Sequence, residues 1–262
     1  MTIIKKRLDV FLRYKPLLGQ LIAKDIKLKY RRSVLGYFWS ILDPLMLMGI
    51  MVLVFSNMFR FEIANYPVYL IIGQTIYNFV SESTSQSTWA IIGNAALMKK
   101  TYVPKYIFTV SRVTSGLVNM IFAMGAMLIV FIICHVRFTA KMLFIPVILV
   151  QVYIFALGLG LLLACGTAFF RDVQHIYSAF LTAWMYATPI FYPIEQLSPK
   201  LIWIIKHFNP LYSYIAQFRT IVLNESLPGA HLVLYGFAMA FLMLIVGGWI
   251  FYKGQDKFIL YI

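Results

Sequence analysis

The chain has 262 residues, of which 61% are hydrophobic and only 12% are charged, and its mean hydropathy is +0.82. A soluble domain has about 45–50% apolar and about 25% charged residues, so this composition excludes a soluble globule and a disordered chain and predicts several membrane-spanning helices. The two cysteines, Cys134 and Cys165, lie in apolar runs, which argues against a disulfide-stabilised secreted domain, and the net charge of +14 has to be interpreted by position.

Residues 1–36 form a basic and only mildly apolar arm. The first long apolar run begins near residue 37 and is too long for the apolar region of a signal peptide, so we expect the arm to be retained. At 3.6 residues per turn, this part of the arm forms an apolar arc of about 140° opposite a basic face. The arc consists of Leu17, Leu18, Leu21, Ile22 and Leu28, and the face consists of Lys24, Lys27 and Arg31. This pattern predicts an amphipathic helix on the inner membrane surface, which either anchors to anionic lipid or docks a soluble partner.

Residues 37–262 are predicted to form an all-α membrane domain, because about 20 apolar residues suffice for one crossing. The six expected spans are residues 37–59, 67–91, 107–134, 144–170, 176–192 and 231–252. An even number of spans places both termini on the same side of the membrane.

The distribution of basic residues predicts which side that is. With a cytoplasmic amino terminus, 17 of the 23 basic residues lie inside, namely ten in residues 1–36 together with Lys99, Lys100, Lys105, Arg112, Arg171, Lys253 and Lys257. The other six lie outside: Arg60, Arg137, Lys141, Lys200, Lys206 and Arg219. Because basic residues favour the cytoplasmic side, we expect both termini in the cytoplasm.

The segment between the last two spans is too apolar for a solvated loop. Asn209-Pro210 divides it into two pieces of roughly 11–13 residues, each too short to cross, and Ser198-Pro199 is typical of the start of a helix. We therefore expect a re-entrant helical hairpin at about residues 193–223 on the outer face. The alternative is a pair of amphipathic helices lying flat among the lipid headgroups.

No enzymatic site is predicted. The four histidines lie at segment ends, no metal-binding or nucleophile motif occurs, and the chain lacks a phosphate-binding loop of the form G-x-x-x-x-G-K-[ST]. We therefore expect no catalytic residue, no metal ligand and no cofactor in this chain. If ATP drives its activity, another chain binds the ATP and magnesium.

Three acidic residues, Asp43, Glu82 and Asp172, lie near the membrane spans, and the first two have unusual surroundings. Residues 81–88 carry almost no apolar side chain and so must face protein or a water-filled cavity, although Glu82 could instead lie among the cytoplasmic headgroups. Asp43 precedes a helix-kinking proline, Pro44, and either hydrogen-bonds at that kink or lines a path.

Two further patterns concern packing and aromatic residues. Small residues recur every four positions in the fourth expected span, at Ala156, Gly160, Ala164 and Ala168, which favours close helix packing and leaves a dimer contact open. Aromatic residues at Trp184, Tyr186, Phe191 and Tyr192 are denser than an interfacial belt requires. They are interpreted either as part of that belt or as a path on which sugar rings stack.

Several ordered motifs resemble the permease subunits of ABC-2 type polysaccharide exporters. They are residues 24–39 (KDIKLKYRRSVLGYFW), 43–45 (DPL), 93–105 (GNAALMKKTYVPK), 169–173 (FFRDV), 187–193 (ATPIFYP) and 208–211 (FNPL). They are spread over nearly the whole chain.

The resemblance implies a homodimer of six-span subunits bound to two copies of a cytoplasmic ATPase in the bacterial plasma membrane. Such exporters move glycans linked to an undecaprenyl-type lipid, such as O-antigen, capsule or teichoic-acid precursors, with no role for nucleic acid. It further implies that the hairpin at residues 193–223 is an outer gate.

The resemblance also assigns three groups of residues. The loop at residues 94–105 would couple to the ATPase through Asn94, Leu97, Met98, Lys99, Lys100, Tyr102, Pro104 and Lys105, with the apolar pair Leu97-Met98 entering a groove of the partner. Residues 16–32 would form the interface helix, with Asp25, Lys29, Arg31 and Arg32, the last three being basic groups for a pyrophosphate head. The translocation path would include Trp39, Asp43, Trp184, Tyr186, Phe191 and Tyr192. The competing functions are an ABC-2 exporter of drugs or small lipids and a stand-alone lipid-glycan flippase.

Overall fold

The computed structural model describes residues 2–29, 31, 33–58, 63 and 65–261, and in these ranges the regular structure is entirely helical. The α-helices are α1 (Thr2–Lys29), α2 (Trp39–Met58), α3 (Tyr66–Thr88), α4 (Ala95–Lys100), α5 (Tyr106–Ile133), α6 (Ile145–Phe169), α7 (Val173–Ala187), α8 (Pro199–Phe208), α9 (Pro210–Val222), α10 (Ala230–Gly254) and α11 (Phe258–Tyr261). The predicted all-α fold is confirmed. The amino-terminal helix is longer than expected, since α1 runs straight through Pro16.

Within the part of the chain that the structure describes, four segments are long and apolar enough to cross a membrane: residues 36–55, 106–133, 140–169 and 230–261. They correspond to the first, third, fourth and sixth expected spans. The second expected span is α3, whose polar half lowers its hydropathy, and the fifth is α7, whose 15 residues reach only about 22 Å at 1.5 Å per residue. The count of six spans therefore stays a prediction.

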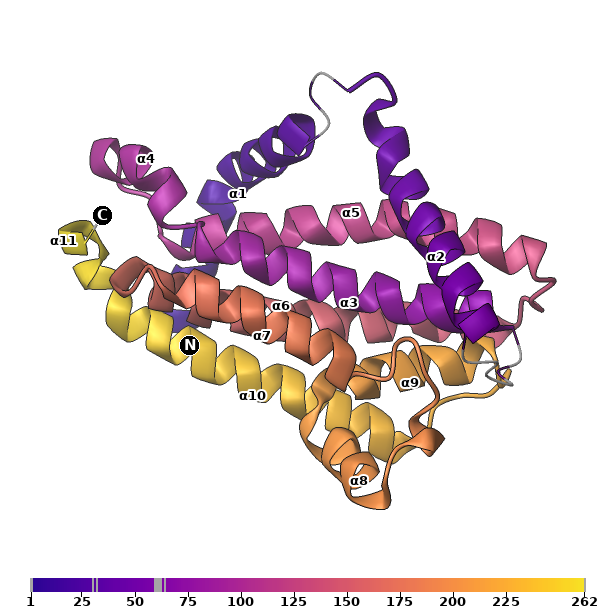
Figure 1. The fold of residues 1–262 in the computed structure, drawn as a ribbon. Helices are drawn as coiled ribbons and strands as arrows, with labels where there is room; N and C mark the ends of the chain where they lie inside the picture. The colour runs from indigo at the N-terminus through magenta and orange to yellow at the C-terminus, as the bar shows by residue number, and fades with distance from the viewer. Residues whose placement is uncertain (1, 30, 32, 59–62, 64, 262) are drawn as a thin grey trace.

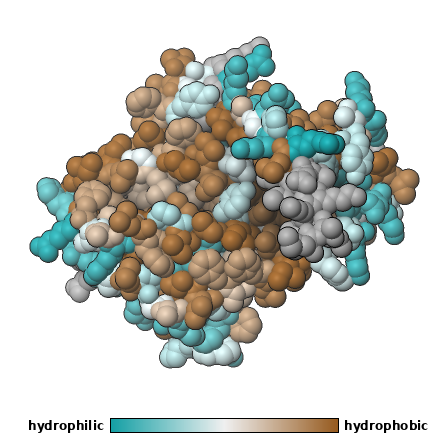
Figure 2. Space-filling view, turned by 180° about the vertical axis from the view of Figure 1, so that it is seen from behind, coloured by the Kyte–Doolittle hydropathy of each residue, from teal (hydrophilic) through white to brown (hydrophobic). Residues whose placement is uncertain are grey.

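The long helices α3, α5, α6, α7 and α10 run lengthwise through one bundle, while α2 crosses them obliquely (Figure 1). The molecule has an end where α4 and α11 lie, called here the α4 end, and an opposite end near α9, called the α9 end. Figure 2 shows apolar side chains over the middle of one face and hydrophilic side chains mainly toward its edges. This distribution is the one expected of a protein with a lipid-covered waist.

The centre of the bundle depends on small residues. A Cβ atom added to Gly116 of α5 would lie 2.0 Å from Ser83 Oγ of α3, and one added to Gly247 of α10 would lie 1.9 Å from the carbonyl oxygen of Gly158 in α6. Close backbone approach of this kind drives helix association in lipid, where the hydrophobic effect between helices is absent.

The stripe of small residues in α6 is used for packing inside this chain. Ala156, Gly160, Ala164 and Ala168 are all buried, and Gly160 lies against Ser87 of α3. Because these side chains are already covered, the prediction of helix packing is confirmed and the stripe is not an open surface for a second subunit.

The segment before α10 forms two helices that break at Asn209, as the sequence predicts, but their environments differ. α9 packs against α3, α6 and α10, with Leu211, Tyr214 and Phe218 fully buried. In contrast, α8 exposes Leu201, Trp203 and Phe208 and lies at the outside of the bundle (Figure 1). Only α8 therefore has the apolar surface expected of a helix at a lipid interface.

Candidate functional site

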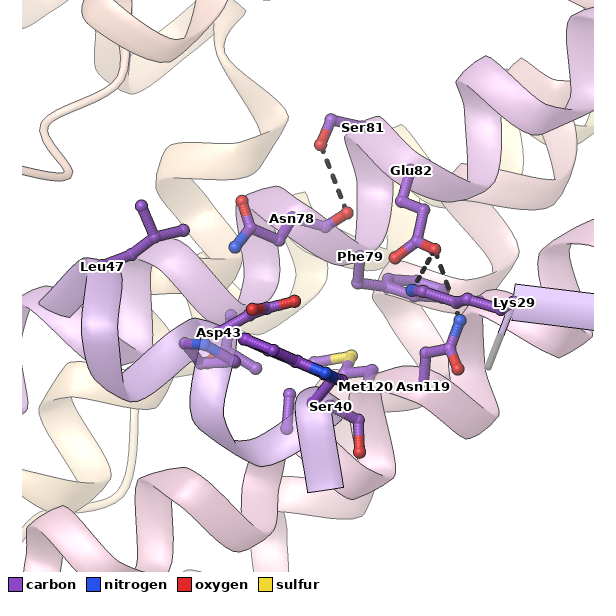
Figure 3. A pocket seen from close by; sticks show the side chains of 15 residues that line it. Lys29, Ser40, Asp43, Leu47, Asn78, Phe79, Ser81, Glu82, Asn119 and Met120 are labelled. Atoms are coloured by element: carbon purple, nitrogen blue, oxygen red, sulfur yellow. Dashed lines mark hydrogen bonds and ion pairs between the residues drawn. The ribbon is translucent and has the colours of Figure 1, made fainter. Parts of the chain in front are cut away.

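A polar cleft lies between the carboxyl end of α1 and the helices α2, α3 and α5. It contains a cavity of about 250 Å³ whose lining includes Trp39, Asp43, Asn78, Glu82 and Asn119. Figure 3 shows Asp43 and Asn78 on facing helices, with Glu82 and Asn119 farther along the cleft. The cleft explains how the polar stretch of α3 is accommodated, because Glu82 faces this cavity while Ser83 and Ser87 pack against glycines of α5 and α6.

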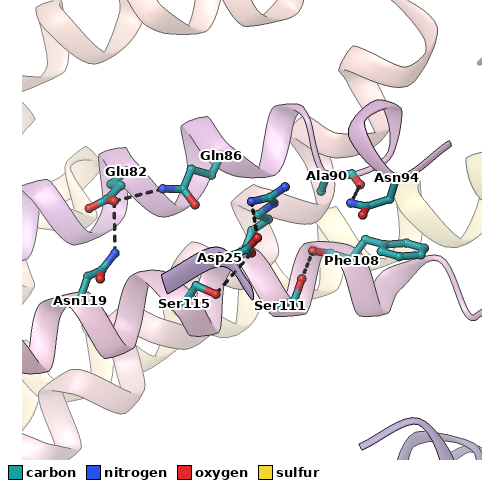
Figure 4. Close-up of polar contacts among 10 residues, drawn as sticks. Asp25, Glu82, Gln86, Ala90, Asn94, Phe108, Ser111, Ser115 and Asn119 are labelled. Carbon is teal, nitrogen blue, oxygen red and sulfur yellow. Dashed lines mark hydrogen bonds and ion pairs between the residues drawn. The ribbon is translucent and has the colours of Figure 1, made fainter. Parts of the chain in front are cut away.

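Glu82 accepts several of the hydrogen bonds formed around the cleft. Its Oε1 atom accepts hydrogen bonds from Lys29 Nζ at 2.6 Å, Gln86 Nε2 at 3.1 Å and Asn119 Nδ2 at 3.3 Å (Figures 3 and 4). Lys29 and Glu82 form an ion pair that is about one-third exposed on each side. The pair fastens the end of α1 to α3.

A second ion pair fastens α1 to α5. Asp25 Oδ1 lies 2.9 Å from Arg112 Nη1, and Ser115 Oγ lies 3.5 Å from Asp25 Oδ2 (Figure 4). Burial raises the pKa of Asp25, while the charges of Arg112 and Lys24 and the hydrogen bond from Ser115 oppose that rise. A second cavity of about 400 Å³ lies beneath α1 here and shares Lys29, Glu82 and Asn119 with the first.

The structure thus divides the predicted interface-helix residues. Asp25 and Lys29 face the bundle through ion pairs, whereas Arg31 is exposed beyond the end of α1 and Arg32 lies outside the described residues. On the apolar arc, Leu21 is buried and Leu28 is exposed, so the arc packs on the bundle only in its first part. Lys29 is already paired with a carboxylate, which makes it a poorer site for a pyrophosphate than the sequence indicates.

The predicted coupling loop lies at the α4 end, where it contains the short helix α4. Met98 is only 8% exposed and packs in an apolar cluster, the α4-end cluster, formed by Leu21, Val103, Phe108, Cys165, Phe251, Phe258 and neighbouring residues. Leu97 packs against the same cluster. The side chain of Met98 is therefore part of the chain's own core in this structure and is not available to a groove of another protein, while the coupling role of the loop stays a prediction.

The exposed surface of the loop consists of other residues. Lys99 and Lys100 are exposed, and Tyr102 is 86% exposed, although its carbonyl oxygen accepts a hydrogen bond of 2.9 Å from Tyr14 of α1. Lys105 Nζ donates to the carbonyl oxygen of Gln255, near the carboxyl terminus. Asn94 donates to the carbonyl oxygen of Ala90 at 2.8 Å, and Pro104 precedes α5. The loop is thus held by both α1 and the carboxyl-terminal segment.

The residues of the predicted path do not lie together. Trp39 and Asp43 line the cleft at the beginning of α2, whereas Phe191 stacks on Phe55, sixteen residues or about 24 Å farther along the same helix. Phe191 is only 4% exposed, so its side chain lines no open path in this structure, and its assignment to the path stays a prediction. Within the aromatic group, Tyr186 remains open, with 61% of its surface exposed.

The other two aromatic residues of this group are held by hydrogen bonds. Trp184 Nε1 donates to Asn209 Oδ1 at 3.0 Å, and the hydroxyl of Tyr192 donates to the carbonyl oxygen of Tyr186 at 2.7 Å. Asn209 also caps α9 by accepting from the backbone nitrogen of Leu211 at 3.1 Å. These contacts give Trp184 a structural role at the break between α8 and α9, whatever else it contacts.

Sequence reasoning counted Arg219 only as an outer charge, but the structure shows it as an anchor. Its guanidinium donates to the carbonyl oxygens of Tyr69, Pro189 and Ile190 at 2.8–3.2 Å and lies 3.2 Å from the centre of the Tyr69 ring. A lone charged residue in a helix that is otherwise uncharged was the signal that could have indicated this role. The anchor ties α9 to α3 and to the loop that follows α7.

These features define a multi-pass, all-helical membrane protein that carries a braced basic loop at one end and a polar cleft between its helices. The chain belongs to the ABC-2 type transporter family, whose model matches residues 16–223.

Its relatives include two O-antigen export system permease proteins named RfbA. The Klebsiella pneumoniae protein is 31% identical to this chain, and the match covers 92% of this chain and 93% of the relative. The Myxococcus xanthus protein is 28% identical, and the match covers 94% of this chain and 95% of the relative. A capsule polysaccharide export inner-membrane protein, CtrC of Neisseria meningitidis, is 23% identical over 74% of each chain.

Proposed function

We propose that this chain is the transmembrane subunit of an ATP-driven exporter that moves lipid-linked polysaccharide of the O-antigen, capsule or teichoic-acid type across the bacterial plasma membrane. The observation that carries the proposal is similarity along nearly the whole chain to export permeases whose names specify O-antigen, joined to the family match. The working unit is a homodimer of this chain with two copies of a separate ATPase, which binds the ATP and magnesium.

The arrangement of the helices supports six crossings with both termini in the cytoplasm. α1, α4 and α11 contribute to one apolar cluster at the α4 end, as an even number of crossings requires. Lys99, Lys100 and Lys257 belong to the same end, in agreement with the excess of basic residues on the cytoplasmic side. α9, anchored inside the bundle at the other end, forms the fixed arm of a re-entrant hairpin, and α8 is the arm that lies at the outer interface and gates the path.

A mechanism follows from the bracing of the coupling loop. Closure of the ATPase dimer around ATP would push on the exposed face of residues 94–105. Because α4 packs in the α4-end cluster with the beginning of α5 and the ends of α6 and α10, the displacement reaches three long helices at once. These helices move as rigid rods and open a path between the two subunits, while the lipid carrier stays in the bilayer.

Two alternative functions are that of an ABC-2 exporter of drugs or small lipids and that of a stand-alone lipid-glycan flippase. No contact in the described residues favours either. A flippase driven by an ion gradient would export without an ATPase, so the dependence on ATP separates it from the proposed function.

We predict that the purified chain alone neither binds nor hydrolyses ATP, because its sequence has no phosphate-binding loop. Co-expression with its cognate ATPase should yield a complex of two permease and two ATPase chains that hydrolyses ATP and exports the glycan from cells. Native mass spectrometry in nanodiscs measures the stoichiometry, and a single permease per complex would refute the homodimer. An ATPase variant that cannot hydrolyse ATP serves as the control, and export that continues with it would refute ATP-driven export.

The topology has its own test, in a background in which Cys134 and Cys165 are replaced. Single cysteines in place of Lys141 and Lys200 should react with an impermeant maleimide in intact cells. Cysteines in place of Lys99 and Lys257 should react only after permeabilisation, since these residues lie at the α4 end. Labelling of position 257 from outside would contradict six crossings.

A further inference from the structure

The cavity between α2, α3 and α5 has the chemistry of a ligand site. We propose that it is a binding subsite for one neutral sugar ring of the exported glycan, in which Asp43, Glu82 and Asn119 accept hydrogen bonds from the sugar hydroxyls and Trp39 lies against the ring. The inference rests on the proposed function, because it takes the exported substrate to be a glycan.

The buried amide of Asn119 is the strongest indication of a missing partner. Asn119 is only 9% exposed, and its Nδ2 atom donates to Glu82, but its Oδ1 atom is buried and accepts no hydrogen bond from the described residues. A buried acceptor without a donor costs free energy, and native structures seldom leave one empty. Asn119 lines the cavity, so a rotation of its side chain that exposes this oxygen would let a ligand hydroxyl satisfy it.

Most of the remaining polar side chains of the lining offer acceptors, whereas the exposed amide of Asn78 can both donate and accept. The hydroxyl groups of Ser40, Thr75 and Ser81 donate to backbone carbonyl oxygens three or four residues earlier at 2.6–3.2 Å, which leaves their oxygen lone pairs available. The three hydrogen bonds to Glu82 all reach Oε1, so its second oxygen can accept another. Asp43 is exposed to the cavity and adds two carboxylate oxygens (Figure 3).

A lining rich in acceptors selects a ligand rich in donors. The hydroxyl groups of a neutral sugar meet this requirement, because each can donate one hydrogen bond. Anionic groups do not, since among the described residues Lys29 is the only basic one lining the cavity and it is paired with Glu82, so no described cation offsets the charge of Asp43 there. Pyrophosphate groups and uronic acids are therefore disfavoured at this position.

The size and the aromatic wall fit one ring. A volume of about 250 Å³ lies below the range of about 300–1,000 Å³ typical of sites for drug-sized ligands, so the cavity accommodates a single sugar rather than an oligosaccharide. Trp39 forms part of the wall and supplies an apolar face on which a sugar ring can pack. The neighbouring cavity beneath α1 shares Lys29, Glu82 and Asn119, so the two spaces adjoin at the ion pair that holds α1.

The test uses the complex of the full chain with its ATPase in nanodiscs and saturation-transfer NMR. Methyl glycosides of mannose, glucose and galactose are the neutral probes, and glucuronate is the anionic probe. At least one neutral glycoside should bind, and Asn119→Leu should weaken that binding at least tenfold. Asp43→Asn, a change at an exposed side chain that should not disturb folding, should raise the affinity for glucuronate relative to the neutral probe.

Gln86 offers a matched control, because it also donates to Glu82 but lines only the cavity beneath α1. Gln86→Leu should change glycoside affinity less than twofold. Binding of glucuronate in preference to every neutral glycoside, or affinities unaffected by both the Asn119 and the Asp43 changes, would overturn the subsite.

The subsite and the proposed function fail separately. If the wild-type complex exports glycan but no neutral glycoside binds, the subsite is refuted and the function stands. If the wild-type complex exports no glycan but binds a neutral glycoside that Asn119→Leu abolishes, the proposed function is refuted while the sugar-binding cavity stands.

Discussion

Replacing Gly247 with alanine should strongly destabilise the protein, whereas the same change at Gly248 should not. The added methyl carbon at position 247 would lie 1.9 Å from the carbonyl oxygen of Gly158 and 2.8 Å from its carbonyl carbon. These are backbone atoms of α6, so no side chain can rotate away and α6 and α10 must separate. Overpacking typically costs about 1–3 kcal/mol, and we expect a value at or above the upper limit here because two long helices lose contact.

Gly248 is the matched control, since a methyl group there meets nothing within 4 Å. In a helix interior alanine is favoured over glycine by up to about 1 kcal/mol, so Gly248→Ala should be neutral or slightly stabilising. Thermal unfolding in detergent, followed by size-exclusion chromatography, measures both variants. Equal melting temperatures for the two would show that α6 and α10 do not pack at Gly158.

The local features of this fold could be predicted from the sequence because each depends on neighbouring residues. Apolar runs predicted the long helices to within a few residues, and Asn209-Pro210 predicted the break between α8 and α9, since proline disfavours helical geometry at the residue before it and has no backbone N–H to donate. The polar stretch at residues 81–88 was correctly predicted to face protein or a cavity. The small residues of α6 were correctly interpreted as packing contacts.

The features that the sequence did not reveal depend on contacts between distant segments. Nothing near Glu82 indicates that its partner is Lys29, 53 residues away, and nothing near Arg219 indicates the carbonyl oxygens of Tyr69 and Pro189. The burial of Met98 and Phe191 was missed for the same reason, since each is covered by helices remote in sequence. An apolar residue in a short loop can face a partner protein or its own core, and only the packing distinguishes the two.

The burial of Met98 changes which residues are expected to meet the ATPase. An apolar pair cannot enter a groove of the partner when one member lies in the α4-end cluster, so Met98→Asp would damage the chain itself by burying an unpaired charge. The side chain most available on this loop is that of Tyr102. Its backbone is held by Tyr14, so the ring is displayed from a fixed position.

We therefore expect Tyr102→Ala to uncouple the exporter without unfolding it. Tyrosine is common among the few interface residues that dominate binding, and losing such a residue costs about 2 kcal/mol or more, or roughly 30-fold in affinity. The ring is 86% exposed, so its removal should leave the melting temperature of the isolated chain almost unchanged. ATPase binding, measured with nanodisc-embedded permease, should fall by that factor, and glycan export should fall with it.

Two further variants separate this explanation from its alternatives. Tyr186→Ala removes another exposed tyrosine, at the α9 end of α7, and should leave ATPase affinity unchanged even if export slows. Lys99→Ala should lower affinity only slightly and chiefly at low salt, because a rim charge mainly steers association. If Tyr102→Ala keeps full ATPase affinity and normal export, the loop at residues 94–105 is not the coupling element. The exposed basic face of α1, with Lys24 and Lys27, then becomes the surface on which the ATPase docks.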